Sequence, residues 1–163
     1  MKKTASRSAR LLDPETIANV GLYYVCFRLS RYGWNVSPAT RSARGFDVIA
    51  SSRDASRTRT IQVKATSRRG AVLLAADLRL VAGDFVVVCR SVLTDSPECF
   101  ILTPEEARDA AVAVERDGRT TFWLQARAYD RPELREAWPR LGVGVSPPRP
   151  SHGPASRSST PRR

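Results

Sequence analysis

Three polar residues, Asp47, Gln62 and Lys64, stand in or beside two apolar stretches of the chain that have the pattern of neighbouring strands. The polar segment 52–58 between the two stretches predicts a β-hairpin, which sets Asp47 opposite the other two residues. Gln62 and Lys64 are two residues apart, so they point to the same face of their strand and Val63 points to the other. A carboxylate, an amide and a lysine therefore converge on one side of the predicted sheet.

This set of groups suits phosphoryl chemistry with a divalent cation. Mg²⁺ prefers oxygen ligands and binds through one or two carboxylates, while water or phosphate fills the remaining positions. A lysine next to such an ion can orient an attacking water or stabilise charge that develops on a phosphoryl group. A structural alternative stays open at this point, because Asp47 and Lys64 could also form a cross-strand ion pair on a solvated face.

The helix that must lie before this hairpin is predicted from its termini. Asp13 is an N-cap acid, Pro14 suits the first helical position, and the helical pattern continues to about Tyr32, where Gly33 ends it. The apolar residues of this segment recur on one face, which predicts a strongly buried helix. The face consists of Ala18, Leu22, Val25, Cys26 and Leu29.

The rest of the chain predicts further strands and two shorter helices. Residues 85–89 form a continuous apolar run, typical of a central strand that is covered on both faces. Thr103 begins a second helix, which we expect to reach about Glu115. Further strands are expected over 34–36, 46–51, 59–65, 72–74, 99–102 and 120–124, and a closing helix over 132–138. This order of elements predicts a single domain of the α/β or α+β class.

Length and composition exclude other classes of chemistry. A chain of 163 residues is about one domain's worth, and its single histidine, His152, lies in a Pro/Ser/Arg-rich segment. Histidine-based triads and histidine-ligated metal sites therefore have no partner in the domain. Cys26, Cys89 and Cys99 match no zinc spacing, and we expect them to be reduced and buried in a cytoplasmic protein. No signal peptide is expected, and no apolar run approaches the roughly 18 residues of a membrane span.

Within the predicted domain the positive charge lies in the first half, while residues 1–12 and 141–163 each add +4 to the net charge of +11. Residues 41–70 hold eight basic residues against two acids, whereas residues 71–140 hold nine basic residues against twelve acids. Such a distribution favours a polyanionic partner, although a merely solvated basic face would have the same composition. Lys64 is the one lysine inside the predicted domain. The candidate phosphate contacts are Arg41, Arg44, Arg68 and Arg69.

The helix, Gly45 and Asp47 at the start of a strand, and Gln62 and Lys64 on the next strand resemble the PD-(D/E)xK nuclease superfamily. The resemblance points in particular to its small prokaryotic members that are restriction-endonuclease-like or Holliday-junction-resolvase-like. It covers about residues 14–90. It implies a restriction-endonuclease-like α/β fold, in which a mixed central sheet is flanked by helices.

The resemblance also implies roles for single residues. Asp47 matches the metal-binding aspartate, and Gln62 matches the second acidic position, where glutamine is an accepted variant. Lys64 matches the catalytic lysine, and the Val63 carbonyl is expected to face the metal, which would be Mg²⁺ or Mn²⁺. The expected partner is DNA, with no membrane, and a homodimer is left open.

The chain departs from the superfamily pattern in the helix. Related sequences have Gly-Glu where this sequence has Gly21-Leu22, and a leucine cannot act as a metal or water ligand. Glu15 lies on the same face seven residues earlier, but it is about 10 Å away along the helix axis and is a poor substitute. The implied metal site thus keeps one acid where many related proteins have three.

Three hypotheses follow. The chain could be a metal-dependent DNA endonuclease, or a catalytically degenerate nuclease-fold module that binds nucleic acid without cleaving it. It could also be a structural or regulatory partner whose charge only keeps it soluble. The expected organisation is a disordered basic arm over residues 1–12, a nuclease-like domain over 13–141 and a disordered Pro/Ser/Arg-rich tail over 142–163.

Overall fold

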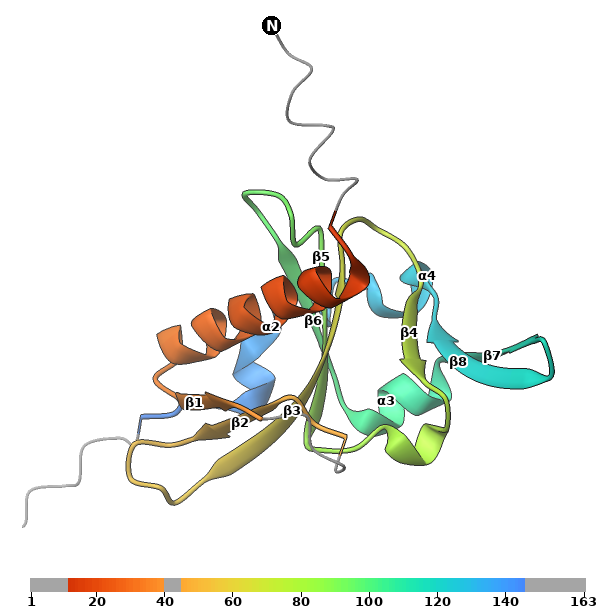
Figure 1. Ribbon diagram of the computed structural model, residues 1–163. Coiled ribbons are helices and arrows are strands. Elements are labelled where there is room, and N and C mark those ends of the chain that lie inside the picture. The colour runs from red at the N-terminus through yellow and green to blue at the C-terminus, as the bar shows by residue number, and fades with distance from the viewer. Residues whose placement is uncertain (1–11, 40–44, 146–163) are drawn as a thin grey trace, which may run out of the picture.

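The computed structural model describes residues 12–39 and 45–145 (Figure 1). In chain order its elements are α2 (Pro14–Arg31), β1 (Asn35–Pro38), β2 (Val48–Ser51), β3 (Thr58–Thr66), β4 (Val72–Ala75), the 3₁₀ helix η1 (Leu78–Leu80), β5 (Phe85–Arg90), β6 (Glu98–Leu102), α3 (Pro104–Asp109), β7 (Ala111–Arg116), β8 (Arg119–Leu124), α4 (Ala126–Tyr129) and the 3₁₀ helix η2 (Trp138–Leu141).

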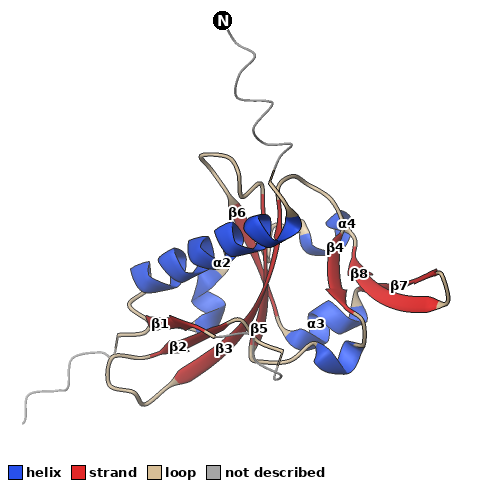
Figure 2. Cartoon of the chain, in the orientation of Figure 1, coloured by secondary structure: helices blue, strands red, loops and turns tan. Residues whose placement is uncertain are grey.

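The strands form two sheets. The main sheet has five strands in the order β1-β2-β3-β5-β6, in which β3 and β5 are parallel and all other neighbours are antiparallel. The second sheet has three antiparallel strands in the order β4-β8-β7. Helix α2 crosses one face of the main sheet, whereas α3 and α4 lie on the side of the second sheet (Figure 2). This confirms the predicted single α/β domain with a mixed central sheet flanked by helices.

Helix α2 begins and ends as its sequence predicts. The Asp13 carboxylate accepts a hydrogen bond from the Thr16 amide at 2.8 Å, which satisfies one of the unpaired amides of the first turn. At the other end Gly33 has a φ of +82°, a conformation in which glycine has no steric cost. Val25 and Leu29 are buried against the main sheet and fix the helix to it.

Strand β5 is buried on both faces, as its unbroken apolar sequence predicts. Val87 and Cys89 belong to the core between α2 and the main sheet. Val86 and Val88 belong to a second core, which they share with residues of the second sheet, α3 and α4. The alternation of side chains along this one strand therefore joins the two layers of the domain.

Two predicted helices are wrong. Helix α3 has the expected capping box, in which Thr103 and Glu106 bond to each other's backbone amides, but it ends at Asp109 instead of about Glu115. The next residues form β7, because Val112 and Val114 alternate with small or polar residues and the strand pairs along its whole length with β8. The closing helix expected over 132–138 is replaced by the short helices α4 and η2, on either side of that range.

The chain after η2 packs against the end of α2. The Gly144 amide donates to the Tyr32 carbonyl at 3.0 Å, and the Arg53 amide donates to the Gly144 carbonyl at 2.9 Å. The described part therefore continues past residue 141, where the tail was expected to begin, and the segments 1–11 and 146–163 lie outside it. No helix in the described part is long and apolar enough to cross a membrane.

Candidate functional site

The β2–β3 hairpin places Asp47 against β3. The strands pair from Val48 opposite Ile61 to Ser51 opposite Thr58. At the start of β2 the Asp47 amide donates to the Ile61 carbonyl at 2.8 Å. The Asp47 carboxylate oxygen Oδ2 in turn accepts a hydrogen bond from the Val63 amide at 2.7 Å. Backbone groups thus hold this carboxylate at the boundary between the two strands.

After Ile61, strand β3 continues beyond the first residue of β2, Val48, and no longer pairs with that strand. The second half of β3 pairs with β5, from Gln62 opposite Val86 to Thr66 opposite Arg90. The amide of a strand residue and its carbonyl point to the same side of the strand, so the Val63 carbonyl points to the side on which its amide binds Asp47. A carboxylate and a backbone carbonyl therefore lie together where the ladder between β2 and β3 ends.

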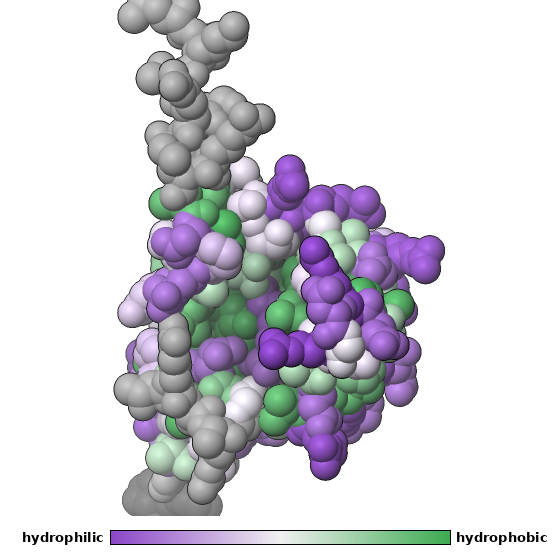
Figure 3. Space-filling view, turned by 45° about the vertical axis from the view of Figure 1, so that its right-hand side comes forward, coloured by the Kyte–Doolittle hydropathy of each residue, from purple (hydrophilic) through white to green (hydrophobic). Residues whose placement is uncertain are grey.

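These groups open into a cleft of about 620 Å³ between α2 and the sheet. It is lined by Pro14, Glu15, Ala18, Asn19, Leu22 and Tyr23 from α2, Pro38 and Ala39 at the end of β1, and Asp47 and Val63. The first half of α2 leaves Ala18 exposed and Leu22 partly buried, so the helix is less buried here than its apolar face predicts. In the space-filling view, hydrophobic surface lies between hydrophilic side chains along the middle of one face (Figure 3).

Gln62 is buried, with 7% of its surface exposed, although its side chain is polar. Within the described part of the chain, its side-chain oxygen Oε1 has no hydrogen-bond partner. Most buried polar atoms in proteins have a partner, and an unpaired one calls for a water, an ion or a ligand group. The Gln62 oxygen is therefore a candidate ligand atom next to Val63.

Lys64 lies on the same face of β3 as Gln62 and opposite Val88 of β5 in the register. Burial lowers the pKa of Lys64, and the negative charge of Asp47 acts in the opposite direction. Asp47, Gln62 and Lys64 thus lie at the same end of the β2–β3 hairpin, but of these three only Asp47 lines the cleft, together with Val63. Gln62 and Lys64 point to the face of β3 opposite to that of the Val63 side chain. Together with the Val63 carbonyl, the three residues offer three oxygen groups and one amine.

The two described arginines that were candidate phosphate contacts differ in what they contact. Arg68 is exposed in the turn after β3. Arg69 forms an ion pair with Asp130 at 2.6 Å, and Asp130 pairs with Arg90 at the same distance. Arg41 and Arg44 lie outside the described residues.

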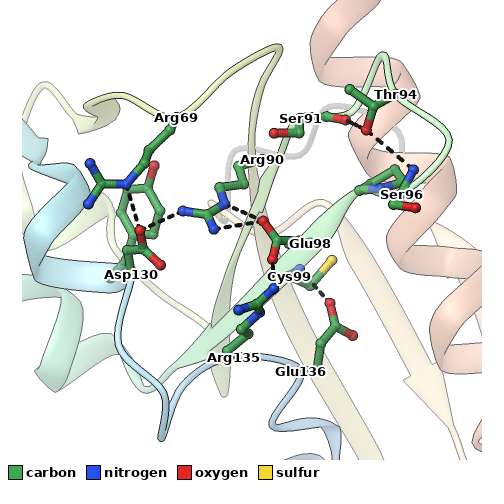
Figure 4. A network of polar contacts seen from close by, with 12 residues as sticks. Arg69, Arg90, Ser91, Thr94, Ser96, Glu98, Cys99, Asp130, Arg135 and Glu136 are labelled. Atoms are coloured by element: carbon green, nitrogen blue, oxygen red, sulfur yellow. Dashed lines mark hydrogen bonds and ion pairs between the residues drawn. The ribbon is translucent and has the colours of Figure 1, made fainter.

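Figure 4 shows that Asp130 belongs to a longer series of ion pairs that fixes the turn after β3. Arg90 binds Glu98 at 2.7 Å as well as Asp130, and Glu98 also pairs with Arg135. Next to this series, the Tyr129 hydroxyl donates to the Gly70 carbonyl at 2.6 Å. Arg69 is therefore held as part of the structure, whereas Arg68 remains oriented to solvent.

The cleft also contains α2 residues that sequence reasoning judged poor or did not single out. Glu15 lines the same cleft as Asp47, although its position along the helix made it a poor substitute for the absent glutamate. Asn19 and Tyr23 were not predicted, and their positions four and eight residues after Glu15, on the same side of the helix, were the signal available for them. The described residues contain no group of three or more histidine, cysteine or acidic side chains that could hold a metal.

No protein-family model matches this chain, and no curated protein sequence matches it. Among solved structures, the chain is similar to a bacterial homing endonuclease, I-Ssp6803I, with a TM-score of 0.54 and 15% sequence identity. The match covers 77% of this chain and 88% of that chain. At this level of identity the similarity shows the fold, which this chain shares with an endonuclease.

Proposed function

We propose that this chain is a metal-dependent DNA endonuclease that hydrolyses phosphodiester bonds. The observation that carries the proposal is the Asp47 carboxylate, held by the Val63 amide beside a cleft and next to Gln62 and Lys64. The resemblance of these residues to the PD-(D/E)xK motif and the likeness to an endonuclease fold support the same function. The net charge of +11 suits a polyanionic substrate.

The oxygen donors of Asp47 and Val63, which line the cleft, and of Gln62, which follows Ile61 on the same strand but does not line it, suit Mg²⁺ or Mn²⁺. The ligand atoms would be a carboxylate oxygen of Asp47, the buried Gln62 Oε1 that has no partner among the described residues, and the Val63 carbonyl oxygen. All three are oxygen atoms, which these cations prefer, and a substrate phosphate would complete the set. When bound, the ion would supply Lewis-acid stabilisation of the charge that develops on the phosphate.

The remaining steps, which are orienting the site and stabilising charge, would fall to residues of the chain itself. The bond from the Val63 amide holds Asp47 in one orientation before substrate arrives, which lowers the cost of organising the site. Lys64 would contribute a positive charge and N–H donors, which orient the attacking water and stabilise the phosphate oxygens. Its partial burial strengthens these interactions, because they act in a medium of lower dielectric constant than water.

Leu22 favours a second candidate function, a nuclease-fold module that binds nucleic acid without cleaving it. Leu22 lines the cleft at the position where related sequences have a glutamate, and it packs against the core. A site with a single carboxylate at the start of the hairpin attracts a divalent cation less strongly than a site with three. The two functions share the binding step and differ only in cleavage.

Incubation with supercoiled plasmid, with Mg²⁺, with Mn²⁺ or with EDTA, tests the proposal. We expect metal-dependent nicking by the natural chain and none by Asp47→Asn or Lys64→Ala. Asp47→Asn removes the negative charge of the carboxylate but keeps the structure, because its amide oxygen can still accept the hydrogen bond from the Val63 amide. DNA that is bound by the natural chain but left intact with both metals would support the binding module instead. Nicking that persists in both variants would contradict the assigned site.

A further inference from the structure

Two aromatic side chains stand exposed on α2. Tyr23 is 64% exposed and Phe27 is 54% exposed, the two highest values among large hydrophobic residues of the described part. The same helix buries Val25 and Leu29 against the sheet, so its orientation is fixed and these two rings face outward. A large aromatic side chain contributes most to the free energy of folding or binding when it is covered. Exposed pairs of such side chains are typical of binding surfaces.

The position of the two rings connects them to the candidate site. Tyr23 lines the cleft that also contains Asp47 and Val63. Phe27 follows one helical turn later and on the same side, and the Arg31 guanidinium lies 5.8 Å from the centre of its ring. The cleft therefore continues into a short strip of two aromatic rings and one cation, which we call the aromatic strip (Tyr23, Phe27 and Arg31).

The size of the cleft matches a short piece of a nucleic-acid strand. A volume of about 620 Å³ is in the range of pockets that take one small molecule, and one or two nucleotides are of that size. In a paired duplex the faces of the bases are stacked on each other and are closed to a side chain at the mouth of a cleft. In an unpaired strand the base faces are open and can stack on an aromatic ring.

We propose, on the basis of the nuclease function proposed above, that the aromatic strip binds unpaired bases of the DNA strand whose phosphodiester enters the cleft. Tyr23 stacks on the base next to that phosphodiester, Phe27 stacks on a base further along, and Arg31 contacts the backbone. The preferred substrate is therefore DNA with a single-stranded segment. Stacking needs only the face of a base, so little sequence preference is expected from this surface.

Binding measured in EDTA tests the aromatic strip separately from cleavage. Fluorescence anisotropy would compare a labelled single strand with a fully paired duplex of the same length and of unrelated sequence. Tyr23→Ala should weaken single-strand binding by about 5- to 100-fold and duplex binding by less than about twofold. Tyr23→Phe keeps the ring and should bind as the natural chain does. Leu80→Ala, which removes a 52% exposed side chain far from α2 in sequence, is the matched control and should change neither value.

The outcomes separate this inference from the proposed function. Loss of single-strand binding in Tyr23→Ala supports stacking even if plasmid is never nicked. Nicking by the natural chain together with unchanged single-strand binding in Tyr23→Ala overturns the inference and leaves the proposed function standing. An equal loss for single strand and duplex also overturns it, since stacking on open bases acts on one and not the other. If Tyr23→Ala instead changes the sedimentation of the free protein, the strip is an interface between copies of the chain, and the inference is wrong.

Discussion

Gly21 of α2 and Ala65 of β3 approach so closely that a Cβ atom added to Gly21 would lie 2.4 Å from the Ala65 Cβ. Only a residue without a side chain fits at this crossing of helix and strand. The close approach also fixes where the next helical residue, Leu22, meets the cleft that contains Asp47. The contact between Gly21 and Ala65, which are not themselves candidate site residues, therefore sets where α2 borders the cleft.

Gly21→Ala should destabilise the domain. Overpacking of this kind costs about 1–3 kcal/mol, of which the better helix propensity of alanine returns up to about 1 kcal/mol. A lower Tm in thermal unfolding is the expected result. Gly70→Ala is the control, because nothing lies within 4 Å of a Cβ placed there. The double variant Gly21→Ala with Ala65→Gly should recover part of the loss, and strictly additive effects of the two changes would contradict the contact.

Leu22→Glu should add a ligand to the cleft at the cost of some stability. The Leu22 side chain is partly buried against the core. A carboxylate at this position should therefore lower the free energy of unfolding by roughly 1–3 kcal/mol when no cation is bound. Mg²⁺ or Mn²⁺ should raise the Tm of Leu22→Glu more than that of the natural chain, because the added carboxylate increases the affinity of the folded state for the ion. If the site is active, nicking should also increase.

Leu22→Gln is the matched variant for this comparison. It has nearly the same shape and polarity as Leu22→Glu, without the negative charge. We expect metal to shift its Tm by about as much as it shifts that of the natural chain. Equal metal-induced shifts in the glutamate and glutamine variants would show that no ion binds beside Leu22.

Arg68 and Arg69 should differ in their effects on DNA binding. Each phosphate contact contributes about 0.9 to the slope of log K against log salt concentration on duplex DNA. Arg68→Ala should make the slope shallower by about 0.9, the contribution of one phosphate contact. Arg69→Ala should change the slope less, because Arg69 is paired with Asp130. Titrations at several salt concentrations give both slopes. A larger change for Arg69→Ala would mean that this ion pair opens when DNA binds.

Acid should weaken the domain partly through Asp130. Its hydrogen bond with Arg69, followed by that with Arg90, lowers the pKa of Asp130 below the usual value of about 3.9. A carboxyl group with a lowered pKa in the folded state stabilises that state fully above its unfolded pKa, and this contribution is lost as the pH falls through the folded pKa. Asp130→Asn should therefore lower the Tm at pH 7, and the difference should shrink below about pH 4.

The loss at pH 7 should be about 1–3 kcal/mol, because the Arg69 side chain is exposed whereas Arg90 and Asp130 are mostly covered. Melting curves from pH 3 to pH 7 would measure it. Asp95→Asn, in the exposed loop after β5, serves as the control for the loss of one carboxylate at a site away from these ion pairs. A deficit in Asp130→Asn that stays constant down to pH 3 would exclude the ion pairs as its cause.

Signals between residues close in sequence were enough to predict much of this fold. The N-cap Asp13, the turn between the two strands of the hairpin, and the unbroken apolar run of β5 each depend on residues close to one another, and each prediction is confirmed. The same local pairing brought Asp47 next to β3, where its carboxylate binds the Val63 amide. Its role as a metal ligand stays a prediction.

The features that were missed depend on contacts distant in sequence. The signal that starts a helix at Thr103 is strong, but it says nothing about where the helix ends, and pairing with β8 decides that Val112 and Val114 belong to a strand. The position of Tyr23 at the cleft likewise depends on how α2 packs against strands that come later in the chain. The pairing of Arg69 with Asp130 joins residues that are 61 positions apart, so the sequence could not separate Arg69 from Arg68.

The assignment of the strands to the two sheets has a consequence for how the domain unfolds. Strand β4 follows β3 in the chain but belongs to the second sheet, whose other strands, β7 and β8, come only after β5 and β6 have completed the main sheet. Every single cut of the chain between β3 and β8 divides the strands of at least one sheet between the two fragments, so no cut separates the two sheets as whole units. Since β5 also contributes to both cores, loss of one layer removes support from the other. The two sheets therefore melt as one cooperative unit, and probes placed in each should report a single transition.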